Sequence, residues 1–122
     1  MESKKFKSKA DMQPEARIQS DLVDYLRMRQ WFCKPTHGNA YQDGFPDIFA
    51  CHHNYGQRWI EVKLPDMKGS KFQASQLRDF PLFCANGSGV WVLTGANKRE
   101  YDKLFKPANW HQFLPIWKNM RD

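Results

Sequence analysis

An aspartate, a glutamate and a lysine in the middle of the sequence have the residue types and the spacing of a metal-binding catalytic centre. Asp47 follows Pro46 at the start of an apolar run, and Glu61 and Lys63 lie two positions apart in a second such run. In a β-strand, side chains two positions apart leave the same face of the sheet. A short turn between the two runs would set Asp47 beside Glu61 on adjacent strands. The spacing therefore predicts two carboxylates and one ammonium group on one sheet face.

Two carboxylates in close contact favour a bound cation. Their mutual repulsion would raise the pKa of one of them, and a divalent ion relieves that repulsion. Oxygen ligands select Mg²⁺ or Mn²⁺ rather than zinc. Such an ion can bind a phosphate oxygen and lower the pKa of a water molecule, while Lys63 would position that water and add positive charge against the transition state. The alternative is a solvated Glu61–Lys63 pair on an exposed strand face, which would contribute less than about 1 kcal/mol to stability.

The composition limits the kinds of protein that could carry this centre. The 122 residues suffice for one domain with one hydrophobic core. Lysine and arginine number 19 against 13 acidic residues, so the formal charge is +6, which favours a polyanionic partner such as DNA. No apolar run approaches the roughly 20 residues of a membrane-spanning helix, and the lysine-rich start has no apolar signal core. We therefore expect a cytoplasmic protein without a membrane partner. The three cysteines lack zinc-ligand spacing and are expected to be reduced thiols.

A helix is predicted ahead of the catalytic pattern, at residues 14–30. Pro14 suits a first helical turn, and Ile18, Leu22 and Leu26 recur at helical spacing. Glu15 lies in the first turn, on or beside the face that would be buried. It is either an acid that interacts favourably with the helix dipole or a functional acid that points inward.

Apolar patterning and turn residues predict the remaining elements. Strands are expected at 31–34, 58–64 and 90–94, and a helix at 75–85. Residues 44–51 are expected to form a turn that runs into a further strand. Pro81 within that helix predicts a kink or an early stop. The order of one helix, three strands, one helix and one strand predicts an α/β sandwich, with a mixed central sheet flanked by helices.

The chain is expected to divide into three parts. We expect a flexible basic arm at 1–12, a folded core at 13–95 and an aromatic-rich extension at 96–122, which would pack on the core or on a second copy of the chain. Interface cores favour aromatic residues over charged ones. The extension therefore predicts a homodimer that buries Trp110, Phe113 or Trp117.

The order of the motifs resembles a known family of nucleases. Pro46-Asp47 followed by Glu61-Val62-Lys63 resembles the PD-(D/E)XK signature. The wider pattern is similar to the VRR-NUC branch of that superfamily, and the resemblance covers roughly residues 14–94. Its parts are an early helix with Glu15 and Gln19, the turn Gly44-Phe45-Pro46-Asp47, the E-x-K strand and the helix start Ser75-Gln76. The resemblance implies a restriction-endonuclease-like fold.

The same resemblance implies a role for each matching residue. Asp47 and Glu61 become ligands of Mg²⁺ or Mn²⁺, with the backbone carbonyl of Val62 as a further ligand. Lys63 becomes the catalytic lysine. Glu15 completes the acid cluster, directly or through water. Gln76 orients water or contacts the phosphate.

The resemblance also implies partners and a setting. Stand-alone VRR-NUC proteins are typical of phages and bacteria and act as homodimers on branched DNA such as four-way junctions. The sequence therefore predicts a metal-dependent DNA endonuclease, selective for junctions or flaps, in the cytoplasm of a bacterium or of a phage-infected host. One alternative is a catalytically idle DNA-binding protein on the same fold. Another is an interaction protein that docks a partner through Trp110, Phe113 and Trp117.

Overall fold

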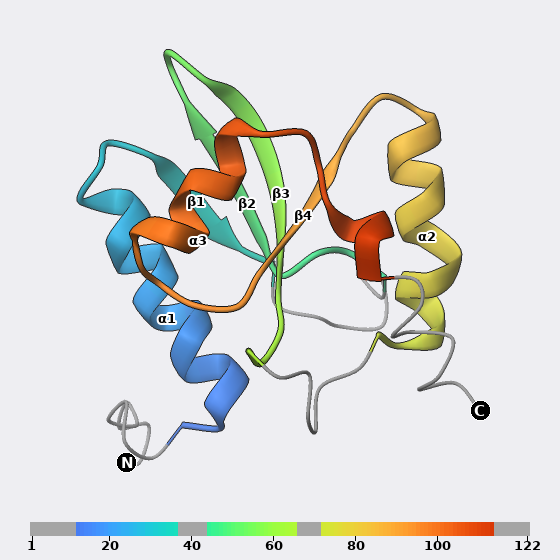
Figure 1. Ribbon diagram of the computed structural model, residues 1–122, viewed down its shortest axis with the longest axis horizontal. Helices are drawn as coiled ribbons and strands as arrows, with labels where there is room; N and C mark the ends of the chain where they lie inside the picture. Colours follow the sequence, from blue (N-terminus) through green and yellow to red (C-terminus); the bar gives the residue numbers. More distant parts are fainter. Residues whose placement is uncertain (1–11, 37–43, 66–71, 114–122) are drawn as a thin grey trace, which may run out of the picture.

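The computed structural model describes residues 12–36, 44–65 and 72–113. The elements in chain order are α1 (Pro14–Arg27), β1 (Phe32–Pro35), β2 (Ile48–His52), β3 (Gly56–Val62), α2 (Ala74–Ala85), β4 (Val90–Leu93), α3 (Lys98–Asp102) and the 3₁₀ turns η3 (Lys103–Phe105) and η4 (Trp110–Phe113) (Figure 1).

The four strands form one mixed sheet in the order β1-β2-β3-β4. The pairs β1–β2 and β2–β3 are antiparallel, whereas β3 and β4 are parallel. The parallel pair requires a crossover, which α2 provides. The predicted α/β fold with a mixed central sheet is therefore confirmed.

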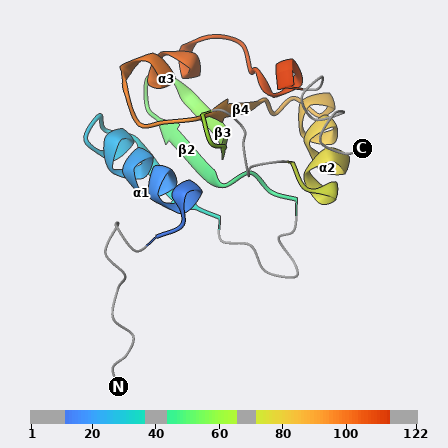
Figure 2. The ribbon, with the colours of Figure 1, turned by 60° about the horizontal axis from the view of Figure 1, so that its bottom comes forward.

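Two hydrophobic clusters lie on opposite faces of the sheet, and each is covered by its own helices (Figures 1 and 2). On one face, α1 and the α3–η3 segment contribute Leu22, Leu26 and Leu104 to a cluster that includes Ile60 and Val62 of β3. On the other face, α2 and η4 pack on β4. Their cluster is Phe72, Phe80, Val90, Val92 and Trp110. Because side chains alternate along a strand, β3 supplies both clusters: Ile60 and Val62 face α1, while Trp59 and Glu61 face α2.

Local sequence explains where the helices begin and how they run. Pro14 occupies the first turn of α1, where its missing N–H costs nothing. The helix ends at Arg27, and the chain reverses through Gln30, which has a φ of 74°. Of the two outcomes predicted at Pro81, a kink or an early stop, the stop does not occur, because α2 continues from Ala74 to Ala85 with Pro81 inside it. The proline ring is exposed, so it meets no packed neighbour.

The strand boundaries differ slightly from those expected. β1 is shifted by one residue and includes Pro35, which an edge strand tolerates because its N–H side needs no partner. β3 begins at Gly56 rather than Arg58 and ends at Val62. Gly56 has a φ of +84°, which glycine adopts without strain and which closes the hairpin after His52.

The C-terminal extension packs back on its own domain as far as the structure describes it. Trp110 is buried, with its ring 6.1 Å from that of Phe80, and its indole N–H donates to Cys84 Sγ. Asn109 bonds both main-chain groups of Val92 in β4, donating to its carbonyl at 3.1 Å and accepting from its N–H at 2.6 Å. Trp117 and most of the predicted basic arm lie outside the described residues.

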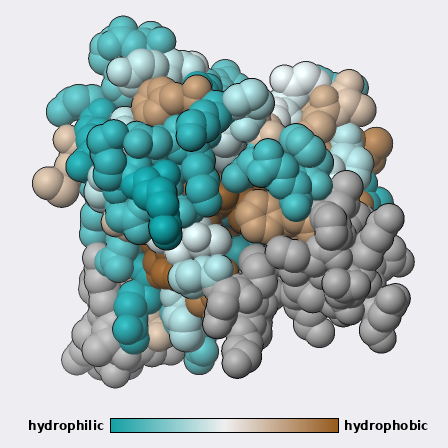
Figure 3. All heavy atoms as spheres, in the orientation of Figure 1, coloured by the Kyte–Doolittle hydropathy of each residue, from teal (hydrophilic) through white to brown (hydrophobic). Residues whose placement is uncertain are grey.

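The surface in view is largely hydrophilic, with hydrophobic side chains in separate patches (Figure 3). In the described part of the chain, no helix has the length and apolar character needed to cross a membrane.

Candidate active site

Asp47 is fixed at the mouth of β2 by three main-chain contacts. Its Oδ2 accepts a hydrogen bond of 2.8 Å from the N–H of Val62 in the neighbouring strand. The carbonyl of Asp47 accepts from the N–H of Thr36 at 2.8 Å, and the Thr36 hydroxyl donates to the carbonyl of Pro46. Because Ile48 pairs with Ile60, Asp47 comes next to Glu61 at the same end of the hairpin. The sequence prediction that these two acids meet across adjacent strands agrees with this register.

The glycine of the G-x-P-D turn has a clear structural reason. Gly44 has a φ of +91°, a conformation that L side chains rarely adopt. A Cβ at this position would also collide with the Asp79 carboxylate and would lie 3.1 Å from the carbonyl of Ser75 in α2. The turn that leads to Asp47 therefore rests directly on the first turns of α2.

Glu61 lies on β3 with its side chain toward α2, and it is only 1% exposed. Its Oε2 accepts a hydrogen bond of 2.8 Å from Gln76 Nε2 and lies 3.2 Å from Lys63 Nζ. Its other oxygen, Oε1, is buried and has no hydrogen-bond partner among the described residues. A buried acceptor without a partner costs about 1–3 kcal/mol, and more when charged, so this oxygen points to a missing ligand.

Gln76 is held at both ends of its amide group. Its Oε1 accepts a hydrogen bond of 3.0 Å from the N–H of Gln73, which is part of a capping box at the start of α2. Its Nε2 donates to Glu61, as described above. Gln76 therefore joins the first turn of α2 to the carboxylate of Glu61. Gln76 is brought into the site as predicted, but its contacts are those of a residue that orients Glu61.

Lys63 is buried beside Glu61 and is only 3% exposed. Its Nζ lies 4.7 Å from the centre of the Phe72 ring, a cation–π contact. Its main-chain N–H donates to the carbonyl of Leu93 at 3.1 Å and so extends the pairing of β3 with β4. This burial excludes the alternative of a solvated Glu61–Lys63 pair on an exposed strand face.

The charges in the site shift the pKa of both strand acids upward. Burial raises the pKa of Glu61 well above its usual range, and the neighbouring charge of Asp47 raises it further, against the opposing effect of Lys63. Burial also raises the pKa of Asp47, although the hydrogen bond from Val62 and the charge of Lys63 oppose that shift. The site therefore carries more negative charge than its own residues stabilise, a condition that a cation would relieve.

Glu15 comes from a different element than the other acids. It lies in the first turn of α1, the helix that covers the opposite face of the sheet from α2. Its negative charge still raises the pKa of Asp47. Within residues 12–36, 44–65 and 72–113, however, no three acidic, histidine or cysteine side chains gather closely enough to hold a metal ion. A role of Glu15 at the metal, directly or through water, therefore stays a prediction, and its electrostatic effect on Asp47 is what the structure adds.

The donor set fits a hard divalent cation. Asp47 and Glu61 offer carboxylate oxygens, and the buried Glu61 Oε1 lacks a partner. Oxygen donors of this kind suit Mg²⁺ or Mn²⁺. The Val62 carbonyl, which the family resemblance implies as a further ligand, belongs to the residue whose N–H already holds Asp47.

Two residues that shape the site were not predicted from the sequence. Thr36 bonds the backbone on both sides of the Pro46–Asp47 peptide. Phe72 fell in a stretch without periodicity, yet its ring covers Lys63. A threonine just beyond a strand could have signalled the first contact. No local pattern predicts the contact between Phe72 and Lys63, because it depends on the path of the chain between β3 and α2.

Comparison with known proteins gives a structural match. No family model matches the sequence, and no curated protein matches it. Among solved structures, a chain described as a VRR_NUC domain superposes with a TM-score of 0.60 at 21% sequence identity, over 78% of this chain and 97% of that chain. The match spans nearly the whole of the other domain, so the shared architecture is complete rather than a fragment. The protein therefore has the fold of a VRR-NUC domain, as the order of its motifs predicted.

Proposed function

We propose that the protein is a Mg²⁺- or Mn²⁺-dependent DNA endonuclease that hydrolyses phosphodiester bonds. The carrying observation is the buried Glu61 carboxylate, which has one oxygen without a partner and lies beside Asp47 and Lys63. Each buried ion costs on the order of several kcal/mol unless it is well compensated. A fold without catalytic use therefore gains nothing from burying these charges. The VRR-NUC fold supports the same proposal, since that domain is described by name as a nuclease.

In this proposal, each residue of the site has a separate role. Asp47 and Glu61, with the Val62 carbonyl, would hold the cation. When bound, such a cation supplies positive charge to the phosphate oxygens and makes water more acidic. Lys63 adds a second positive charge on the same side and can donate a hydrogen bond to the attacking water or to the phosphate. Gln76 keeps the Glu61 carboxylate in one orientation.

Glu15 would act at longer range. Its charge raises the pKa of Asp47, so it increases the affinity of the acid pair for a cation. The resemblance implies that Glu15 also reaches the cation, directly or through a water molecule. The core at 13–95 would then contain every residue of the site.

DNA is the expected substrate because the chain carries a formal charge of +6. Counterion release favours binding of such a chain to a phosphate backbone. We propose selectivity for four-way junctions or flaps and a homodimer with two active sites. Trp110 is covered by its own chain, so it leaves Phe113, which is half-buried, as the described candidate for a dimer contact. Sedimentation at micromolar concentration tests the dimer, and a species near the 14.5 kDa chain mass would exclude it.

The direct test of the nuclease is a cleavage assay on linear, flapped and four-way DNA, with Mg²⁺, Mn²⁺, Ca²⁺ or excess EDTA. We expect cleavage in Mg²⁺ and Mn²⁺, binding with little turnover in Ca²⁺, and no cleavage in EDTA. Asp47→Asn, Glu61→Gln and Lys63→Met should each abolish cleavage and keep the fold. Undiminished cleavage in EDTA, or full activity in any two of these variants, would refute the assignment.

An exposed ion pair provides matched controls for these variants. Lys98 and Asp102 form an i,i+4 pair on α3, with an N–O distance of 2.8 Å. Lys98→Met and Asp102→Asn make the same chemical changes away from the site and should leave cleavage unchanged. The alternative proposal, an idle DNA-binding protein on the same fold, predicts tight binding without cleavage in every metal.

A further inference from the structure

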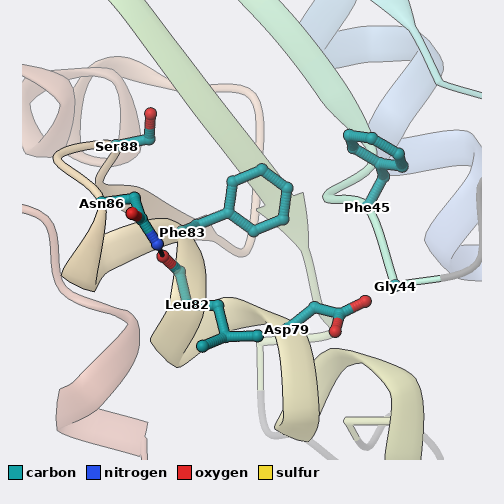
Figure 4. Close-up of a pocket in the computed structure, with 7 residues that line it drawn as sticks. All are labelled: Gly44, Phe45, Asp79, Leu82, Phe83, Asn86 and Ser88. Atoms are coloured by element: carbon teal, nitrogen blue, oxygen red, sulfur yellow. Dashed lines mark hydrogen bonds between the residues drawn. The ribbon is translucent and has the colours of Figure 1, made fainter.

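A cavity of about 330 Å³ lies between the turn that leads to Asp47 and the helix α2. Gly44 and Phe45 form one wall, and Asp79, Leu82 and Phe83 of α2 form the other (Figure 4). The volume is at the lower end of the range for ligand pockets, which limits an occupant to roughly the size of one planar ring system. The candidate active site makes no use of this cavity.

The cavity is built on the same two elements that hold the candidate active site. Phe45 comes two residues before Asp47 on one turn. Asp79 comes three residues after Gln76, so it lies about one helical turn further along α2. A DNA strand with its phosphate at Asp47 and Glu61 would therefore have a neighbouring nucleotide within reach of this cavity.

The two aromatic rings that line the cavity, Phe45 and Phe83, belong to a larger aromatic cluster. Phe45, Trp59 and Phe83 make a triad with ring centres 5.6–5.7 Å apart. Phe45 is nevertheless 39% exposed, and Leu82 is 56% exposed. A flat ligand cannot enter between Phe45 and Phe83, because that would need about 7 Å, twice the ~3.5 Å contact distance. It can stack on the exposed part of Phe45 that lines the cavity, which Leu82 also lines.

The polar groups of the cavity select against a phosphate. The Asp79 carboxylate points toward Gly44 at the mouth of the cavity (Figure 4). Its hydrogen bonds from Arg78 lower its pKa, so it stays ionised and acts only as an acceptor. At the far end lies Asn86, whose amide nitrogen is already bonded to the carbonyl of Leu82. An anion is repelled by this lining, whereas a neutral ring with N–H donors is accommodated.

We propose that this cavity binds one unpaired nucleobase of the DNA strand being cleaved, stacked on Phe45 with an amino group directed at Asp79. The inference rests on the proposed nuclease function and names what that site would recognise. A paired base cannot leave its stack without an energetic cost, whereas a base at a flap or a branch point is already free. The cavity therefore gives a physical reason for preferring such DNA over a continuous duplex.

The test is a cleavage assay on flapped DNA in which a single abasic residue is walked along the strand near the cut. One abasic position should slow cleavage by roughly tenfold, since the loss of one base stacked on an aromatic side chain weakens binding by about that factor. Phe45→Leu, which keeps apolar contact but removes the ring, should slow cleavage of intact DNA by a similar factor. Phe45→Trp should restore it.

Phe105→Leu is the matched control. Phe105 is 44% exposed, close to the value for Phe45, and also packs in an aromatic cluster, but it lies in η3 beside Tyr101 and Tyr55. Its replacement should leave the cleavage rate unchanged. Thermal unfolding of both leucine variants separates a loss of stacking from a loss of stability.

Combining the two changes gives the decisive measurement. If Phe45 holds the base, Phe45→Leu and the abasic residue remove the same contact, so together they should cost no more than either alone. Asp79→Ala should also abolish a preference for adenine, cytosine or guanine over thymine, which has no amino group. Additive losses, or equal cleavage of intact and abasic strands at every position, would overturn this inference alone. A wild-type protein that cleaves none of the substrates would overturn the proposed function and this inference together.

Discussion

Replacing Glu61 with glutamine should make the metal-free protein more stable while abolishing cleavage. Glutamine has the same shape and keeps an oxygen for Gln76 and Lys63, but it removes one of two negative charges from a buried cluster. Asp47, Glu61 and Lys63 together carry one excess negative charge when all are ionised, and Glu61 Oε1 has no partner among the described residues. The glutamine amide still buries a polar group where Oε1 was, so the gain comes from removing the buried charge. We expect a gain of at least about 1 kcal/mol in the free energy of unfolding at pH 8 in EDTA, because the raised pKa of Glu61 means that the folded protein disfavours its charged form.

The pH dependence of this gain has a definite sign. Burial and the charge of Asp47 raise the folded-state pKa of Glu61 above the 4.5 of an unperturbed glutamate. The folded protein then binds a proton that the unfolded chain releases, so the wild type loses stability as the pH rises from about 4.5 toward the folded-state pKa. Glu61→Gln has no such loss. Its advantage should be absent at pH 4 and should grow as the pH rises toward the folded-state pKa of Glu61.

Glu100 provides a control of opposite sign. It is also buried, at 2% exposed, and its Oε1 accepts from Lys103 Nζ at 2.8 Å and from the Thr94 N–H at 2.9 Å. Burial raises its pKa, but these hydrogen bonds outweigh burial and leave the pKa lowered. Glu100→Gln should therefore destabilise the protein by about 1–2 kcal/mol at pH 8. That cost should shrink as the pH falls through the folded-state pKa.

Urea unfolding followed by tryptophan fluorescence at pH 4 and pH 8, with and without Mg²⁺, measures all of these quantities. Mg²⁺ should stabilise the wild type by about 2.7 kcal/mol at a hundredfold excess over its dissociation constant, and Glu61→Gln should lose most of this gain. The reasoning fails if Glu61→Gln is as destabilising as Glu100→Gln in EDTA at pH 8. Equal stabilisation of both proteins by Mg²⁺ would count against the cation site.

Three further changes test other parts of the structure. Glu15→Gln should slow cleavage by more than its effect on stability suggests, because a role at the helix dipole alone contributes about 0.3–1 kcal/mol to stability. Near-normal cleavage rates with a slightly lower melting temperature would show that Glu15 has only this structural role. Asn109→Ala should lower the free energy of unfolding in urea by about 2–4 kcal/mol, since it leaves two buried main-chain groups of Val92 without partners. A loss below about 1 kcal/mol, the value of one ordinary hydrogen bond, would show that water replaces the amide. Thr36→Val should reduce cleavage while changing the melting temperature little, because the hydroxyl holds the Pro46 carbonyl beside the site, and rescue by Thr36→Ser would separate the hydroxyl from packing.

The central hairpin could be predicted from the sequence because its signals are local. Alternation along β3 sets Glu61 and Lys63 on one face whatever the rest of the chain does. The turn near Gly56 fixes the register with β2, so the position of Asp47 follows. The helix α1 was equally predictable, since Pro14 and a regular apolar spacing are enough to define it.

The burial of the site could not be predicted, because it depends on residues that are distant in sequence. Lys63 is covered by Phe72, and Glu61 is held by Gln76 of α2. A two-residue spacing on a strand is compatible with both an exposed face and a covered one. The early stop at Pro81 does not occur for a similar reason. A proline destabilises a helix interior by a local rule, but α2 packs on β4 and continues through Pro81.

The location of Asp47 and Glu61 on consecutive antiparallel strands has a consequence for how the protein folds. The β2–β3 hairpin joins residues close in sequence, whereas the parallel pairing of β3 with β4 must wait for the α2 crossover. Local pairings form earlier than distant ones. The two acids should therefore repel each other in the folding transition state, before Gln76 is in place. We expect Mg²⁺ to accelerate refolding in stopped-flow experiments, with a smaller effect on the unfolding rate. The cation of the proposed nuclease would then also speed the assembly of the site that binds it.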